Sequence, residues 1–291
     1  MFDFPGIYKE ADDISNRTQK QYLLILRLFL GLLLFSTIAF SYFSSIREVK
    51  LVNAIASLVI VILSFLFTFI NFQGTWYNAR AVAESIKTIC WRFATKSEPY
   101  NISEIDAKRL LLKTIKDIVD MNHDFQKNIS SRFSSDQQIP DNMAQMRELP
   151  LIERLEVYYK YRVIDQRNWY IKKSRWNRRR SYIFFTILMV VSIILSIFLF
   201  LDLKELIQSS TAQVYYPIEI LLSILSVIFT WVQTKKYKEL DKSYALASHE
   251  IGFIATQKEL VKTENDLSEY VINSENAFSR EHTQWIARKD K

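Results

Sequence analysis

Residues 182–201 read YIFFTILMVVSIILSIFLFL, a stretch of twenty residues without a charge. At about 1.5 Å of rise per residue, such a stretch crosses a hydrocarbon layer of about 30 Å as one helix. Residues 28–46, 51–72 and 214–232 are similar in length and composition. The sequence therefore predicts an all-α membrane protein with four transmembrane helices in two hairpins, whose long helices extend into a cytoplasmic helical bundle.

Basic residues lie almost entirely on one side of these spans. The hairpin connections at residues 44–50 and 202–213 hold three of the 38 lysine and arginine residues, and the other 35 lie on the opposite side. The positive-inside rule places that side in the cytoplasm. We therefore expect a multi-pass protein of the bacterial inner membrane with both termini cytoplasmic, which binds membrane lipids. The single cysteine excludes an intramolecular disulfide.

Five segments follow from this topology. They are an N-terminal cytoplasmic helix (1–27), a first hairpin (28–72), a cytoplasmic helical region (73–180), a second hairpin (181–233) and C-terminal cytoplasmic helices (234–291). Only four glycines occur in the chain, so the helices are expected to be long and unbroken. One helix is expected to start at Pro150 and to continue through Arg180 into the third span.

Apolar residues outside the spans recur at intervals of three and four, which is typical of amphipathic helices. Ser97-Glu98-Pro99 is expected to stop the first of them, and Ser103 with Asp106 resembles a capping box for the next. Residues 130–147 are polar and aperiodic, which favours a linker. The rows expected to be buried, partly between subunits of a homo-oligomer, are Val82, Ile86, Ile89 and Phe93; Leu111, Ile115, Ile118, Asn122, Phe125 and Ile129; and Leu240, Tyr244, Ala247, Ile251 and Ile254.

No catalytic constellation is apparent, so we expect no enzymatic activity and no cofactor. His123, His249 and His282 lie far apart without metal-ligand spacing, which argues against a metal site. The net charge of +7 is explained by the topology, and no nucleic-acid partner is expected.

Two spans carry a polar face. Glu219, the only charged residue within any span, begins a row at helical spacing, and the second span echoes it. Such a row either lines a pore or lets helices pack closely through small polar contacts. The candidate pore-lining residues are Ser57, Ser64, Thr68, Asn71, Glu219, Ser223, Ser226, Thr230 and Gln233.

A basic run precedes the third span. It has a simple explanation as an orientation determinant whose side chains reach the membrane surface, and a sharper one as a binding site for lipid headgroups or phosphate. The residues are Lys172, Lys173, Arg175, Arg178, Arg179 and Arg180.

Several motifs carry a resemblance to a known family. They are WYNAR (76–80), AESIK (83–87) and WRF (91–93); Arg162, DQ (165–166), WY (169–170), KK (172–173) and Asn177; and SY (243–244), HE (249–250), SREHT (279–283), Trp285 and AR (287–288). In this order they resemble the SLATT superfamily of prokaryotic membrane proteins, in the four-span version with tandem SLATT units. The resemblance implies an effector of a nucleotide-signalled defence system that perturbs the membrane as a pore.

Cations and aromatic rings near these motifs suggest a receptor for a phosphate-bearing second messenger, because guanidinium groups bind phosphate well. The candidate ligand-binding residues are Arg80, Glu84, Lys87, Trp91, Arg92, Arg280, His282, Trp285 and Arg288. The plain alternative is structural, since Arg80, Glu84 and Lys87 are spaced for ion pairs on one helix. A sensor protein encoded nearby is the other possible source of the signal.

Two functions therefore stay open. The favoured one is a pore-forming or pore-gating effector of anti-phage defence that disrupts the inner membrane. The alternative is a membrane-anchored interaction scaffold or receptor without pore activity.

Overall fold

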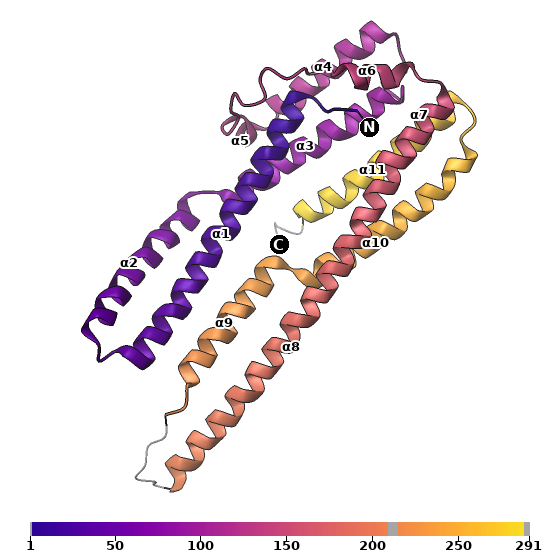
Figure 1. Ribbon diagram of the computed structural model, residues 1–291. Helices are drawn as coiled ribbons and strands as arrows, with labels where there is room; N and C mark the ends of the chain where they lie inside the picture. Colours follow the sequence, from indigo (N-terminus) through magenta and orange to yellow (C-terminus); the bar gives the residue numbers. More distant parts are fainter. Residues whose placement is uncertain (1, 209–214, 288–291) are drawn as a thin grey trace. The chain divides into compact units, whose positions relative to one another are not determined.

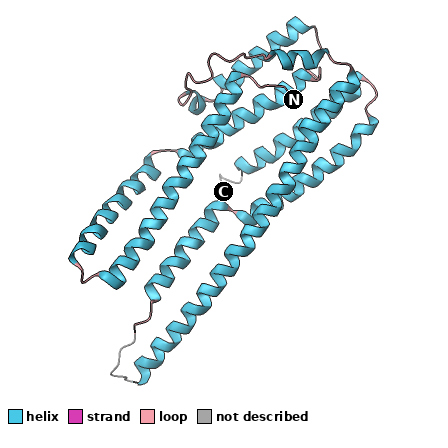
Figure 2. Ribbon diagram, viewed as in Figure 1, coloured by secondary structure: helices cyan, strands magenta, loops and turns pink. Residues whose placement is uncertain are grey.

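The computed structural model describes the backbone of residues 2–208 and 215–287 and the side chains of residues 2–204 and 215–279. Within these ranges the chain is helical and has no strand (Figure 2). Its elements are α1 (Gly6–Phe43), α2 (Arg47–Phe69), α3 (Phe72–Ala94), α4 (Glu104–Asp120), α5 (His123–Gln126), α6 (Asp141–Glu148), α7 (Leu151–Tyr158), the π-helix η1 (Tyr159–Ile164), α8 (Asp165–Gln208), α9 (Ile218–Lys235), α10 (Tyr237–Thr256), the 3₁₀ turn η2 (Gln257–Leu260) and α11 (Glu264–Ala287) (Figure 1).

The four predicted spans are confirmed as helices. Four helical segments of the described chain are long and apolar enough to cross a membrane: Gly6–Phe43, Arg47–Phe69, Leu151–Lys204 and Ile218–Leu260. Three of them, with 38, 54 and 43 residues, extend well beyond the hydrocarbon thickness, as the scarcity of glycine predicted. α1 also passes without a break through the segment boundary predicted at residue 28.

The chain divides into two compact units. The bundle unit comprises residues 1–21, 72–174 and 242–291, and the spanning unit comprises residues 22–71 and 175–241. α1 and α8 each contribute residues to both units. Each unit is described by itself below.

The bundle unit is organised around α3, which packs against α4, α5, α6 and α11. Its predicted apolar row is confirmed, because Val82, Ile86 and Phe93 are buried and Ile89 packs against the same core. Ile251 on α10 is buried as well. The predicted N-cap before α4 is present, because the Asp106 amide donates to Ser103 Oγ at 3.3 Å; the Asp106 carboxylate accepts from the Ser103 hydroxyl at 2.6 Å, where a full capping box would use the Ser103 amide. The side of the membrane on which this unit lies stays a prediction.

The spanning unit contains aromatic contacts between its helices. Tyr22 and Phe29 on α1 both meet Phe67 on α2, edge to face. Between the two hairpins, the Thr37 hydroxyl of α1 lies 3.3 Å from the Ser223 hydroxyl of α9. Phe198 on α8 packs against Tyr216 just before α9. Large apolar side chains are exposed on all four helices, which is the distribution expected where lipid is the solvent.

Two sequence-based predictions about local structure were wrong. Residues 130–147 are not only a linker, because they include most of α6, which supplies the buried residues Met143 and Arg147 to the core. The row from Leu111 does not continue on one helix to Ile129. α4 ends at Asp120, and the Asn122 side chain donates to the Ile118 carbonyl at 2.6 Å, which satisfies a carbonyl that a longer helix would have used.

The fourth span also ends at a defined point. Lys236 adopts a left-handed backbone with φ of 47° between α9 and α10. This conformation is unusual for a residue with a Cβ atom, and it separates the spanning helix from the amphipathic helix that follows.

Candidate functional site

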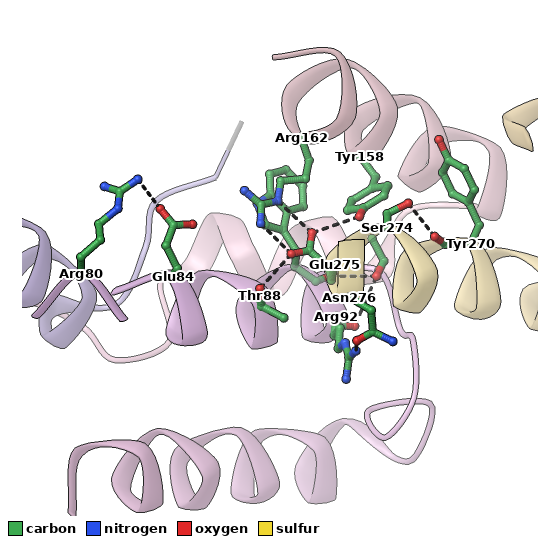
Figure 3. A network of polar contacts seen from close by, with 12 residues as sticks. Arg80, Glu84, Thr88, Arg92, Tyr158, Arg162, Tyr270, Ser274, Glu275 and Asn276 are labelled. Carbon is green, nitrogen blue, oxygen red and sulfur yellow. Dashed lines mark hydrogen bonds and ion pairs between the residues drawn. The ribbon is translucent and has the colours of Figure 1, made fainter. Parts of the chain in front are cut away.

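The most deeply buried charges of the bundle form one network between η1, α3 and α11 (Figure 3). The Arg162 side chain is 2% exposed and the Glu275 side chain 0%. The guanidinium donates from Nε to Oε1 at 2.8 Å and from Nη2 to Oε2 at 2.6 Å. The carboxylate also accepts from the Tyr158 hydroxyl at 3.0 Å and the Thr88 hydroxyl at 2.9 Å. Three of these hydrogen bonds are buried, and the one from Thr88 is partly buried.

Such a pair is stable only when its hydrogen bonds replace the lost hydration. Burial by itself lowers the pKa of Arg162, but the charge of Glu275 and its hydrogen bonds raise that pKa above the usual value. Burial and the same carboxylate raise the pKa of Tyr158. Arg162 therefore stays protonated and Tyr158 stays neutral, and the Arg162 guanidinium lies 4.7 Å from the Phe278 ring. The network ties the π-helical turn, which leads directly into α8, to α3 and α11.

Two further buried arginines bind backbone carbonyl groups around the turn after α3. Arg147 donates to the carbonyls of Phe93, Tyr100 and Ile102. Arg154 donates to the carbonyls of Thr95 and Leu149, and it also pairs with Glu264. These contacts satisfy carbonyl groups at the end of a buried helix, so both arginines act as internal caps.

The candidate ligand-binding residues on α3 lie in different environments. Arg80 pairs with Glu84 at 2.6 Å, the i,i+4 ion pair of the structural alternative, and it lies 3.5 Å from Asp12. Arg92 donates to Asn276 on α11 at 2.9 Å, and burial lowers the pKa of Lys87.

The aromatic and C-terminal candidates are placed differently. Trp91 has no exposed surface and packs against the rings of Phe2 and Tyr158, so it belongs to the core and offers no face to a ligand in this arrangement. Arg280, His282, Trp285 and Arg288 lie outside the side chains that the structure describes.

Two family models match the chain in tandem. SMODS and SLOG-associating 2TM effector domain 3 (SLATT_3) matches residues 5–155, and SMODS and SLOG-associating 2TM effector domain 1 (SLATT_1) matches residues 158–285. The chain belongs to the SLATT family. Each matched region contains one of the two hairpins, as a tandem pair of two-span units requires. Comparisons with curated proteins and with solved structures found no match.

The candidate pore-lining residues of this SLATT protein lie mostly on exposed surface of the single chain. On α9, Ser223 is half-buried against Thr37, whereas Glu219, Ser226, Thr230 and Gln233 are exposed. On the second span, Ser57, Ser64, Thr68 and Asn71 are exposed, and the three hydroxyl groups donate to carbonyl groups of their own helix. Apart from Ser223, the residues of both rows are exposed in the described part of the chain.

The basic run on α8 is exposed at all six positions from Lys172 to Arg180. Three of its members lie over aromatic rings: Lys173 over Trp169, Arg178 over Tyr182 and Arg180 over Trp176. This arrangement suits the membrane surface, where cations and aromatic rings meet lipid headgroups.

The sequence alone did not reveal the roles of Arg147, Arg154 and Glu275. Arg162 was recognised only as part of a family motif. A signal was nevertheless present. Arg162 follows Leu155 and Tyr158 at helical spacing, and Glu275 follows Leu267 and Val271 in the same way. Charges of opposite sign on two apolar faces indicate a buried ion pair, because an isolated buried charge is too costly.

Proposed function

We propose that this SLATT protein is a membrane effector of a prokaryotic anti-phage defence system driven by nucleotide signals, and that several copies form or gate a pore in the inner membrane. The observation that carries the proposal is the polar row on α9. Glu219, Ser226, Thr230 and Gln233 are exposed on a helix whose surroundings are otherwise apolar. A carboxylate facing lipid is unfavourable. A second copy of the chain or water in a pore would cover this row.

The bundle would control the pore. η1 forms part of the buried network, and α8 continues from it into the third span without a break. A signal that changes the packing of α11 against α3 would reach that span through one continuous helix. Arg80, Lys87 and Arg92 are the described cations that we propose for reception of a nucleotide second messenger or a sensor protein.

Water access to the row in the activated protein tests the proposal. Single cysteines at positions 226 and 230 should react with a water-soluble thiol reagent after activation, whereas one at Ile228, on the opposite face of α9, should not. Native Cys90 gives little background, because it is fully buried and burial raises the pKa of its thiol. If the polar and apolar positions react alike, the row does not line water.

Ion selectivity gives an independent test in planar bilayers. Glu219→Lys should move the reversal potential toward anions, because a ring of carboxylates would become a ring of ammonium groups. Ser226→Leu should block conductance. Both variants should retain the wild-type oligomeric state.

The topology on which this depends can be tested with reporter fusions. Alkaline phosphatase fused after residue 291 should be inactive, and fused after Lys204 it should be active. The reverse pattern would place the bundle outside the cell and overturn a cytoplasmic signal.

The scaffold alternative rests on a different surface. Leu246, Phe253 and Leu260 are exposed at 60%, 75% and 72% and are spaced seven residues apart in the bundle unit. A row of this kind suits a partner helix. Replacing all three by serine would abolish partner recruitment in a scaffold, whereas in the pore-forming effector it would leave the conductance of the activated protein intact.

A further inference from the structure

Basic side chains from three helices gather at one end of the spans. The Arg27 guanidinium of α1 lies 5.3 Å from the centre of the Trp231 indole, and Lys235 Nζ of α9 lies 5.7 Å from the same ring. The Arg180 guanidinium of α8 lies 5.4 Å from the Trp176 ring. All of these residues belong to the spanning unit, and they come from both hairpins.

Tyr237 lies at the centre of this cluster. Its side chain is buried between Trp176, at 5.7 Å between ring centres, and Phe184, at 5.5 Å. Its hydroxyl oxygen accepts a hydrogen bond from Trp231 Nε1 at 3.2 Å, and the charges of Arg180 and Arg27 both act on it. Within the described residues no acceptor takes the hydroxyl proton, so the group can donate one hydrogen bond to a ligand.

The two guanidinium groups need an anion. Neither Arg27 nor Arg180 forms an ion pair with a carboxylate in the described part of the chain. The charges of both guanidinium groups act on the Tyr237 hydroxyl, so an anion bound beside that hydroxyl would be attracted by both. Guanidinium groups donate two parallel hydrogen bonds to phosphate, which makes phosphate the anion that suits them best.

The position of the cluster along the chain identifies the source of the phosphate. Arg27 directly precedes the first span, Arg180 comes two residues before the third and Lys235 three after the fourth. Side chains at these points lie at the level of lipid headgroups. Exposed apolar side chains continue from there along α1 and α8, where acyl chains can lie.

We propose that Arg27, Arg180 and the Tyr237 hydroxyl form a specific site for the phosphate of an anionic phospholipid. The phosphate accepts hydrogen bonds from both guanidinium groups and from the tyrosine. It thereby links α1 of the first hairpin to α8 and α9 of the second. The site does not depend on whether the spans form a pore.

Native mass spectrometry of the full chain in detergent tests the site by titration with phosphatidylglycerol and with phosphatidylcholine. The wild type should bind one phosphatidylglycerol per chain more tightly than phosphatidylcholine. The double variant Arg27→Gln, Arg180→Gln should weaken this binding by about tenfold or more, because each charged hydrogen bond contributes substantially to affinity. Lys238→Gln is the matched control, since it removes an exposed cation next to Tyr237 that belongs to none of the candidate sites, and it should bind as the wild type does.

The other outcomes are equally informative. Equal affinity for the two lipids, or equal affinity of the double variant and Lys238→Gln, overturns the proposal. Displacement of the lipid by an excess of inorganic phosphate would assign the site to a soluble ligand instead. If circular dichroism shows that the double variant does not fold, the lipid affinity of Tyr237→Phe provides the test, because this change removes only the hydroxyl oxygen proposed to contact the phosphate. Unchanged affinity of Tyr237→Phe then rejects the site.

Discussion

The bundle unit and the spanning unit distribute their side chains in opposite ways. The bundle buries charged groups together with its apolar core: Arg162 forms an ion pair with Glu275, and Arg147 donates hydrogen bonds to backbone carbonyl groups. The spanning unit exposes large apolar side chains such as Phe40 and Phe69, at 71% and 77%. The contrast shows that the two units are built for different solvents. Water drives apolar residues into the bundle, whereas lipid imposes no such separation on the spans.

The largest effect expected concerns the ion pair at the centre of the bundle. Glu275→Leu should lower the free energy of unfolding by about 3–5 kcal/mol, because it leaves Arg162 buried without its counter-charge. Adding Arg162→Leu should recover most of that loss. Thermal unfolding in detergent measures both.

Glu219→Leu provides the contrasting measurement in the spanning unit. Because Glu219 is exposed and has no ion-pair partner among the described residues, this change should leave the melting temperature unchanged. Equal losses for Glu275→Leu and Glu219→Leu would remove the distinction between the units.

Two positions on opposite faces of α10 test the core of the bundle. Ile251 is 2% exposed and Phe253 is 75% exposed. Ile251→Asp should cost about 3 kcal/mol or more, because it buries an unpaired charge, whereas Phe253→Asp should have little effect on stability. Differential scanning calorimetry of the two purified variants compares their melting temperatures directly. A wild-type melting temperature for Ile251→Asp would show that this face is not packed as described.

Two leucines with nearly equal exposure test whether an exposed position faces lipid or water. Leu58 on α2 is 61% exposed and Leu246 on α10 is 60% exposed. Leu58→Arg should make membrane insertion less favourable by about 3 kcal/mol, because arginine is strongly disfavoured near the middle of a span. Leu246→Arg should change stability by less than about 0.5 kcal/mol. A glycosylation-based insertion assay measures the first and thermal unfolding the second.

The smallest effect expected is at the start of α4. Ser103→Ala should destabilise the bundle by about 1 kcal/mol, because the Asp106 amide loses the side-chain oxygen that accepts its hydrogen bond. Ser103→Asp, which retains an acceptor, should be close to the wild type. If the alanine variant unfolds like the wild type, the cap contributes nothing measurable.

Much of the fold could be predicted because its signals are local. The four spans follow from composition, the cap at Ser103 from three neighbouring residues, and the continuous helix from Pro150 into α8 from periodicity without a breaker. The helix at residues 141–148 escaped prediction because its sequence is polar and short, and its stability comes from contacts of Met143 and Arg147 with the core.

The contacts of the candidate site were harder to predict from the sequence than the fold. Arg80 and Glu84 pair as neighbours on one helix, which their spacing allowed. Arg162 and Glu275 lie 113 positions apart in the sequence, and no local pattern around either residue indicates which residue it pairs with. Trp91 stands beside Arg92 in the family motif, yet only the packing of α3 reveals that the Trp91 ring is fully buried and that Arg92 is half-buried.

By itself the sequence determined that this protein has four stretches long and apolar enough to span a membrane, that its basic residues lie outside them and that its helices are long. These properties depend on the transfer free energy and the propensity of about 20 contiguous residues, which are local sums. The tertiary structure decided which charges are buried in pairs, which polar row stays uncovered and which cations meet at the ends of the spans. Those outcomes depend on distances between residues far apart in sequence, because Coulombic and hydrogen-bond energies arise only where the folded chain brings the groups together.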